Sequence, residues 1–289
     1  MPEIDLDKVI LRPLRRNELD IAVQWAADEG WNPGLKDAEV FWNTDPEGFL
    51  AAEHDGELVA TGSIVSYGGQ YGFMGLFIVR PDLRGQGIGT KLWFHRRDVL
   101  KSRMDATAAI GMDGVFDMQP WYAKGGFIFT HRNLRMEGVA EESATCDEVR
   151  TPTADLFEQI QSYDTLCFGC NRESFLHQWL SMPNGHPLTY IQNEKILGYG
   201  VIRKCQQGYK IGPLFADNTQ VAKALFDGLS NHAVGEEIWL DIPENNVNAV
   251  ALAEMQGMKE VFGCARMYYG SPPPMPWEKI YGISTFELG

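Results

Sequence analysis

Short apolar runs and longer amphipathic stretches follow one another along the first half of the chain, as in a domain of mixed strands and helices. Turn signals such as Gly68-Gly69 separate the apolar runs, and Asn17 is placed to cap the first helix, which Gly30 would end. The expected elements are a strand (9–14), two helices (17–30 and 38–42), a meander of three strands (48–53, 58–67 and 70–79), a helix through 92–100, a strand (106–112), a short helix (120–124) and a last strand (127–137).

The second half repeats this order of elements after a polar connection over residues 138–153. The expected elements there are two helices (154–162 and 172–180), three strands (188–192, 196–204 and 209–214), a helix (219–230), a strand (237–241), and a final helix and strand that end at Tyr269. The pattern therefore predicts two copies of one α+β architecture.

The domain organisation follows from this repeat. We expect a first domain over residues 1–140, a second over 150–270, and a tail over 271–289. The tail begins with the run Ser271–Trp277, which is too rich in proline for regular structure and is expected to pack along the surface.

The most informative local pattern is a glycine-rich turn between an apolar strand and a helix. The apolar run Phe73–Val79 leads to glycines at 85, 87 and 89, where a missing Cβ lets a ligand approach the backbone. The first turn of the helix that follows offers unpaired N–H groups and a positive dipole end to an anion. A Walker loop would end in Gly-Lys-Ser/Thr, and a dinucleotide fingerprint needs Gly-x-Gly-x-x-Gly; this turn has neither pattern.

The turn, read as Arg84-x-x-Gly87-x-Gly89, resembles the signature of the GCN5-related N-acetyltransferase (GNAT) superfamily. The resemblance implies a fold of two tandem GNAT-like domains, each a mixed, mostly antiparallel twisted sheet flanked by helices. It also implies acetyl-coenzyme A as co-substrate, with its pyrophosphate on the loop amides, its pantetheine along the strand, and its thioester carbonyl polarised by an N–H near Phe77 or Ile78. The residues that it assigns to the cofactor are Phe77, Ile78, Val79, Arg84, Gly85, Gln86, Gly87, Ile88, Gly89 and Thr90. The alternative is an ordinary surface turn that caps a helix.

A second motif, Tyr122-x-x-x-Gly126-Phe127, is similar to the Tyr-x-x-x-Gly-Phe segment of the same superfamily. The resemblance implies that Tyr122 donates a proton to the departing coenzyme A thiolate. A phenol suits this role, because a pKa near ~10 keeps it protonated at neutral pH. The alternative is a tyrosine packed under the sheet. Family members often carry Asn and Ala where this chain has Val115 and Met118, so the pantetheine contacts on that side are less well defined.

The general base has no clear candidate. Many members of the superfamily place a glutamate on the strand before the loop, but residues 75–79 contain no acid. Glu29 and Trp31 lie between the first two expected helices, which border the acceptor pocket in this fold. Glu29 could bind or deprotonate an ammonium group, and Trp31 could offer a cation–π face. The alternative is a helix end at Gly30 with a solvated acid and a core tryptophan.

The second copy lacks the cofactor chemistry at two places. Pro213 has no N–H and Asp217 adds a carboxylate where the first copy has its loop, and Ala253 stands in place of the tyrosine. This copy resembles the non-catalytic C-terminal domain of tandem acetyltransferase-like proteins. We therefore expect it to wall the acceptor pocket or to mediate association into a homo-oligomer.

The composition and charge of the chain limit which kinds of partner it is expected to bind. The net charge of -14, without a basic run, argues against nucleic acid and favours a cationic acceptor. No apolar stretch approaches ~20 residues and Met1–Asp5 does not begin a signal peptide, so no membrane association and a cytoplasmic location are expected. The 5 cysteines and 6 histidines are scattered and no metal is expected; the isolated Cys167-x-x-Cys170 pair has no partner pair.

These observations predict an N-acetyltransferase that moves an acetyl group directly from acetyl-coenzyme A to the primary amine of a small molecule or of an amino acid-like or polyamine-like acceptor. Two alternatives remain open from the sequence. One is a non-catalytic acyl-coenzyme A sensor, and the other is an enzyme that transfers a longer acyl chain.

Overall fold

The computed structural model describes residues 4–289; Met1–Glu3, part of the segment expected to hold no signal peptide, lie outside the described residues. The first half contains β1 (Ile10–Pro13), α1 (Arg16–Asp28), α2 (Asp37–Thr44), β2 (Phe49–His54), β3 (Glu57–Tyr67), β4 (Tyr71–Val79), α3 (Ile88–Ser102), β5 (Ala109–Val115), α4 (Gln119–Lys124) and β6 (Ile128–Val139). The second half contains β7 (Val149–Arg150), α5 (Phe157–Phe168), α6 (Glu173–Ser181), β8 (Gly185–Gln192), β9 (Lys195–Lys204), β10 (Tyr209–Ala216), α7 (Thr219–Ser230), β11 (Glu237–Pro243), α8 (Val247–Met255), β12 (Lys259–Tyr269) and β13 (Ile280–Gly282).

Strand alternation explains how helices cover both faces of the first half's sheet. On β2, Phe49 and Ala51 pack into the cluster that contains α1 and α2, whereas Leu50 and Ala52 pack into the cluster that contains α3. β1 to β4 pair antiparallel, and β4 pairs parallel with β5. The order of elements and the mixed, mostly antiparallel sheet agree with the expected α+β fold.

The start of α1 differs from the expectation. Asn17 lies inside the first turn, and Arg15 is the residue that precedes the helix. Glu18 accepts a hydrogen bond of 2.8 Å from the Arg15 main-chain N–H and is ion-paired with Arg12 at 2.7 Å. The carboxylate of Glu18, at the third helical position, thus satisfies the N–H of Arg15, and Asn17 is not the capping residue.

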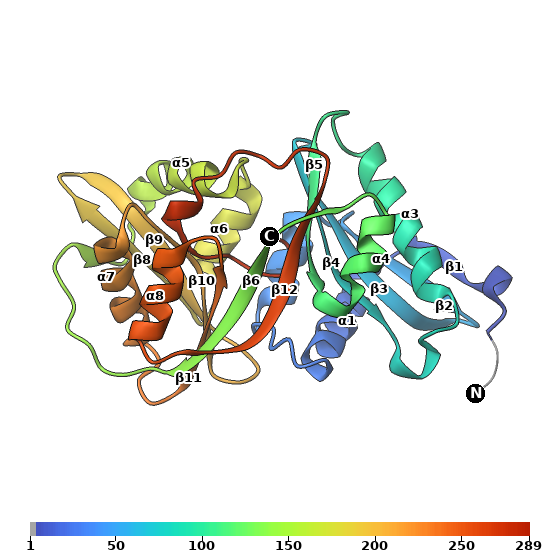
Figure 1. The fold of residues 1–289 in the computed structure, drawn as a ribbon, viewed down its shortest axis with the longest axis horizontal. Helices are drawn as coiled ribbons and strands as arrows, with labels where there is room; N and C mark the ends of the chain where they lie inside the picture. Colours follow the sequence, from blue (N-terminus) through green and yellow to red (C-terminus); the bar gives the residue numbers. More distant parts are fainter. Residues whose placement is uncertain (1–3) are drawn as a thin grey trace.

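The two halves exchange their last strands. β6, expected to complete the first copy, pairs with β11 of the second copy, and β12 pairs with β5 of the first. β6 and β12 also pair with each other, so one continuous sheet runs through both copies in the order β1-β2-β3-β4-β5-β12-β6-β11-β10-β9-β8-β7. Figure 1 shows β6 and β12 side by side at the centre of the molecule. The strand expected over residues 127–137 is present as β6, but both of its neighbours, β11 and β12, come from the second half, a pairing that the local pattern does not specify.

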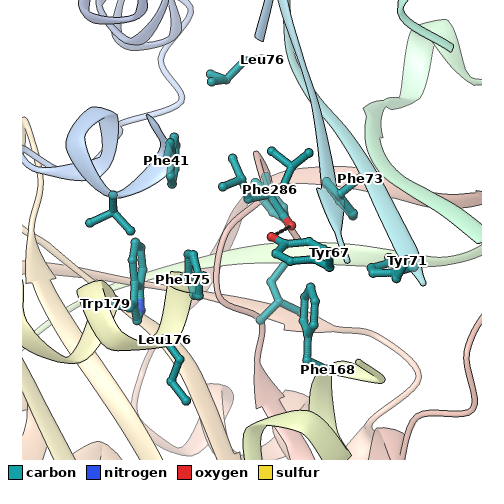
Figure 2. Packing of buried hydrophobic residues seen from close by; sticks show 14 of the residues in the cluster. Phe41, Tyr67, Tyr71, Phe73, Leu76, Phe168, Phe175, Leu176, Trp179 and Phe286 are labelled. Carbon is teal, nitrogen blue, oxygen red and sulfur yellow. Dashed lines mark hydrogen bonds between the residues drawn. The ribbon is translucent and has the colours of Figure 1, made fainter. Parts of the chain in front are cut away.

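The largest hydrophobic cluster is shared by the two copies. It joins α1 and α2 to α5 and α6, so residues such as Phe41 pack in one core with Phe175 and Trp179. Figure 2 shows these side chains together with Tyr67 and Phe73 of the first sheet. α7 and α8 instead cover the other face of the second half, over a cluster of their own. The two copies are thus joined by the shared sheet and by a common core.

The start of the tail lies at the surface as expected, because residues 271–276 are exposed or half-buried and have no regular structure, whereas the end of the tail enters the core. Residues 280–289 are all buried. β13 pairs antiparallel with β10, with Gly282 opposite Leu214, and the Ile283 N–H donates a 2.8 Å hydrogen bond to the Asp241 carbonyl of β11. The prolines end at Pro276, and the apolar residues that follow are free to enter the core. None of the helices in residues 4–289 has the length and apolar character that a membrane span requires.

Candidate active site

The site begins where β4 and β5 separate. The two strands pair in parallel from Tyr71 opposite Ala109 to Met74 opposite Met112, and the described pairing ends there. At the same level the pairing of β3 with β4 shifts its register, and Leu76 adopts a positive φ of 44°. A leucine in this backbone region is strained, and such strain is typical of functional sites. The separation of the strands opens the sheet next to the glycine-rich loop.

A cleft of about 550 Å³ occupies this opening. The expected residues that line it are Phe77, Ile78, Val79, Arg84, Gly85, Gly87, Gly89, Thr90, Tyr122, Glu29 and Trp31. Gln86 and Ile88 are not part of the lining: the Gln86 Oε1 accepts a 2.9 Å hydrogen bond from the Ile4 N–H, and Ile88 is buried in the core under α3. Val115 and Met118, the two departures from the family pattern, also line the cleft.

The loop geometry fits an anionic group. Gly85 and Gly87 have φ values of +80° and +89°, which glycine adopts without strain. A Cβ at Gly85 would meet no atom within 4 Å, so the backbone there is open. Gly87 precedes α3, and no side chain caps the helix. The first-turn amides of this 15-residue helix therefore remain available to a phosphate.

Arg84 and Glu29 form an ion pair at the edge of the cleft. The Arg84 Nε also donates a 3.0 Å hydrogen bond to the Val79 carbonyl, which fixes the guanidinium beside the end of β4. Glu29 follows the last residue of α1, and Gly30 has a φ of 78°, so this stretch is also the helix end that the alternative described. The Glu29 carboxylate is already engaged by the Arg84 guanidinium, and this geometry favours a positioning role for Glu29.

Tyr122 lies in α4 at the inner end of the cleft. Its ring packs 4.9 Å from the Trp93 ring, measured between centroids, and a Cβ at Gly114 would collide with it. Burial raises the pKa of Tyr122 to about 12, and the nearby charge of Arg96 opposes part of this rise. The phenol is thus protonated throughout the neutral range, as a proton donor must be.

A second, smaller cavity of about 70 Å³ lies beyond Tyr122. Trp31, Phe77, Val115 and Tyr122 line both the cleft and this inner cavity, so the two are neighbours. The remaining walls come from β4, β5, α3, the exchanged strand β12, and the tail, which contributes Phe286 and Glu287. The second copy and the tail therefore form part of the first copy's site.

Arg96 is a residue of this site that the sequence reasoning missed. It is fully buried in α3 and crosses β3 at Gly62, where any Cβ would collide with its guanidinium. Its Nη2 donates to the carbonyls of Ser63 at 2.6 Å and Gly75 at 2.8 Å, both at the register shift. Burial lowers the pKa of Arg96 to about 9. The signal was present in the sequence, since Arg96 interrupts the apolar face formed by Leu92 and Leu100.

Two acidic side chains also line the inner cavity. Asp113 is fully engaged, because it accepts from both Nε and Nη2 of Arg266, at 2.8 and 2.7 Å, and from the Asn133 amide at 2.8 Å. Glu287 comes from the tail, where the proline-rich composition of the preceding segment had obscured it. Asp113 is thus tied to structural partners, and Glu287 is the other carboxylate at the cavity.

The cysteines do not form a reactive pair in this fold. Cys167 and Cys170 are buried free thiols, and burial raises the pKa of Cys170 to about 12 and that of Cys167 further still. A thiol with a raised pKa is a poor nucleophile and a poor metal ligand. Residues 4–289 contain no cluster of His, Cys, Asp or Glu side chains placed to hold a metal ion.

The corresponding region of the second copy is arranged differently. Asn218 caps α7, and its side chain accepts a 3.1 Å hydrogen bond from the Val221 N–H. The Asp217 carboxylate accepts from the Tyr163 hydroxyl at 2.8 Å and from the Lys279 Nζ at 2.9 Å. Ala253 is fully buried. The N-terminus of α7 is therefore capped, Asp217 is hydrogen-bonded within the protein, and Ala253, which replaces the tyrosine, is packed in the core.

Comparison with known proteins assigns both halves to one family. Residues 17–127 match the model of the acetyltransferase (GNAT) family, and residues 160–282 match an acetyltransferase (GNAT) domain model. The holothin acyltransferase of Pseudoalteromonas sp. (strain SANK 73390) is 30% identical over 280 residues, which cover 96% of this chain and 94% of that protein. An uncharacterised N-acetyltransferase of Bacillus subtilis, YitH, is 23% identical over 79% of this chain and 82% of its own length.

Solved structures share the fold over the whole chain. A putative acetyltransferase from Pyrococcus horikoshii superposes with a TM-score of 0.83 at 23% identity, covering 99% of this chain and 98% of its own. A tandem GNAT protein from the clavulanic acid biosynthesis pathway superposes with a TM-score of 0.63 at 14% identity, covering 92% and 99%.

Proposed function

This chain belongs to the GNAT acetyltransferase superfamily as a tandem GNAT protein, and on that premise we propose that its N-terminal half transfers an acetyl group from acetyl-coenzyme A to a primary amine. Homology to a curated acyltransferase supports acyl transfer as the general activity. The acetyl group, the amine acceptor and the roles of individual residues are the more specific parts of the proposal.

One observation carries the proposal. A single cleft joins an uncapped helix N-terminus at Gly87 to a buried, protonated phenol at Tyr122. The helix end suits the pyrophosphate of a coenzyme A thioester, and the phenol suits the proton that its sulfur needs when the thioester breaks. Both features are needed for transfer, whereas binding alone needs only the first.

The remaining lining residues have definite roles in this proposal. The loop amides of Gly85 to Thr90 hold the pyrophosphate, and the open edge of β4 from Phe77 to Val79 pairs with the pantetheine. An N–H near Phe77 polarises the thioester carbonyl. Arg84, held by Glu29, adds a positive charge at the edge of the cleft. Much of the rate then comes from holding the amine and the thioester together.

The expected acceptor is a small cationic amine. The acidic surface attracts cations, and the inner cavity beyond Tyr122 is walled by the aromatic residues Trp31, Phe262 and Phe286. A group of this kind reaches the thioester from the side of the cavity, opposite the loop.

A thiol-release assay tests the proposal. We expect the full chain to release coenzyme A from acetyl-coenzyme A only when a suitable amine is added, across a panel of amines that includes benzylamine and polyamines. Tight binding of acetyl-coenzyme A without thiol release by any amine would favour the alternative, a coenzyme A-binding sensor. Faster release with a longer acyl thioester would revise the acyl group and keep the transfer.

A further inference from the structure

The tail brings a carboxylate to the first copy's site from the far end of the sequence. After β13, the chain passes Gly212 of β10, where a Cβ would lie 2.6 Å from the Ile283 carbonyl oxygen. It then reaches the register shift of β4, where Gly75 leaves room for the Glu287 backbone. A side chain at Gly212 or at Gly75 would collide with the tail backbone, so both glycines are needed for the tail to pack in this place.

Hydrogen bonds fix the Glu287 backbone in this place. The Ser63 hydroxyl donates to the Glu287 carbonyl at 3.3 Å and accepts from the Gly75 N–H at 2.9 Å. The Tyr67 hydroxyl donates to the Leu288 carbonyl at 2.8 Å. Phe286 packs among the shared aromatic residues of both copies (Figure 2). Contacts of Phe286 and Leu288, the residues before and after Glu287, therefore fix the position of Glu287.

The Glu287 side chain has no structural partner. Its residue is 3% exposed and lines the inner cavity, yet no hydrogen bond or ion pair of its carboxylate is found among residues 4–289. Leaving a buried carboxylate without a partner is costly, so such groups are usually engaged with a ligand in a functional site.

The charged groups that face Glu287 have other partners, apart from one nitrogen of Arg203. Arg135 of β6 is paired with Asp241 at 2.7 Å, and Arg203 of β9 is paired with Asp37 at 3.0 Å, while the Arg203 Nη1 has no hydrogen-bond partner among residues 4–289. The Lys210 Nζ of β10 donates to the carbonyls of Trp31 and Asn32, at 3.3 and 3.1 Å. Burial raises the pKa of Glu287, and the nearby Lys210, Arg135 and Arg203 charges oppose this rise while Asp37 adds to it. A raised pKa makes the carboxylate a stronger base.

We propose that Glu287 binds the ammonium group of the acceptor in the inner cavity and acts as the general base of the transfer. The inference rests on the proposed function and supplies the acid that β4 lacks. Trp31, Phe262 and Phe286 are among the aromatic residues that line the same cavity, so it fits an ammonium carried on an apolar group.

The acceptor nitrogen loses two protons during the transfer, one to Glu287 and one to Tyr122. Glu287 takes one proton from the acceptor ammonium, and the freed lone pair forms the C–N bond to the acyl carbon as the C–S bond breaks. Tyr122 gives its proton to the sulfur, and the second proton of the nitrogen restores the phenol. The proton on Glu287 leaves to solvent, which regenerates the base.

The test compares Glu287→Gln with Glu278→Gln, an exposed glutamate of the same tail. With benzylamine as the probe, or the best amine of the panel if benzylamine is slow, Glu287→Gln is expected to lower kcat/KM roughly 10²-fold at pH 7. Coenzyme A affinity by calorimetry should change less than a few fold, and Glu278→Gln should match wild type. The defect should shrink as the pH approaches the pKa of the amine itself, near ~10 for an alkylammonium, because the free amine then needs no base.

Thermal unfolding supplies a readout that does not depend on turnover. A carboxyl whose pKa is raised by folding costs stability once the pH rises through that pKa, so the neutral amide of Glu287→Gln should raise Tm relative to wild type more at pH 8 than at pH 5. A lower Tm at pH 8 would mean that Glu287 is a structural ion-pair partner.

Two results separate the inference from the proposed function. Wild-type protein that releases no thiol with any amine contradicts the proposed function itself. Wild-type protein that turns over while Glu287→Gln keeps the same kcat/KM and pH profile contradicts the role of Glu287 alone.

Discussion

The two copies differ at the point where the fourth strand of each copy separates from the fifth: the first copy has an open cleft there, and the second copy is closed. In the first copy β4 leaves β5, the helix after it starts at an uncapped Gly87, and the opening remains a cleft. In the second copy β10 pairs with β11 over residues 209–211, and β13 of the tail pairs with Leu214 and Phe215 of β10. Asn218 caps the helix that follows β10. One backbone frame thus yields a ligand site or a closed core, according to a few side chains and the path of the tail.

A second comparison concerns the helix that follows the fifth strand of each copy, α4 in the first copy and α8 in the second. Each ends in a glycine with positive φ, and the next residue donates back to the same helix position: Phe127 to the Tyr122 carbonyl at 3.4 Å, and Met258 to the Ala253 carbonyl at 3.0 Å. The backbone is therefore equivalent at Tyr122 and Ala253. The difference in chemistry lies in the side chain, which is a phenol in one copy and a methyl group in the other.

The largest effect is expected from a charge placed in the first copy's loop. Gly85→Asp points a carboxylate into open space in the cleft and should weaken coenzyme A binding roughly 10³-fold, since two unit charges about 4 Å apart repel by about 4 kcal/mol at an effective dielectric of about 20. Gly56→Asp is the control, because Gly56 also has a positive φ and open space but lies in the β2–β3 turn. Calorimetry that finds equal affinity in both variants would remove the loop from the site.

The tail should matter to the stability of both copies. Leu288 is fully buried in the shared core, and Leu288→Ala is expected to lower the free energy of unfolding by roughly 2–5 kcal/mol. Val261→Ala, at a half-exposed position of β12, should change it by no more than about 0.5 kcal/mol. Urea unfolding measures both, and a loss near zero for Leu288→Ala would mean that the tail is not docked in the core.

Removing the phenol hydroxyl of Tyr122 tests whether the difference between Tyr122 and Ala253 explains the chemistry of the first copy. Tyr122→Phe should lower kcat roughly 10²-fold while coenzyme A affinity stays within a few fold. Because the pKa of Tyr122 lies near 12, wild-type activity should show no loss from its ionisation below about pH 10. Tyr190→Phe, in β8 of the second copy, serves as the control. Full activity in Tyr122→Phe would assign the proton to water.

The smallest effect is expected at the edge of the cleft. Glu29→Gln removes the partner of Arg84, and a solvent-accessible ion pair of this kind contributes about 0–1 kcal/mol. We expect kcat/KM for the amine to fall less than about 5-fold, consistent with a positioning role. Steady-state kinetics that show a loss near 10²-fold would instead make Glu29 the base and would compete with the assignment of Glu287.

Local sequence patterns predicted the parts of this molecule that depend on neighbouring residues. The glycine loop and the Tyr122 turn are short motifs whose chemistry is local, and the structure brings both to one cleft. The exchange of β6 and β12 could not be predicted, because the two long strands have similar patterns and either could pair in either place. Glu287 was hidden for another reason: its path depends on room left by Gly75 and Gly212, more than seventy residues away in sequence.

The stoichiometry of coenzyme A binding tests the central comparison most directly. The full chain is the right specimen, because each copy contains a strand of the other. Equilibrium titration with coenzyme A should saturate at one molecule per chain, and Gly85→Asp should weaken binding at that one site roughly 10³-fold. Saturation at two molecules per chain, or a site that survives Gly85→Asp with full affinity, would show that the second copy binds the cofactor and would contradict the account.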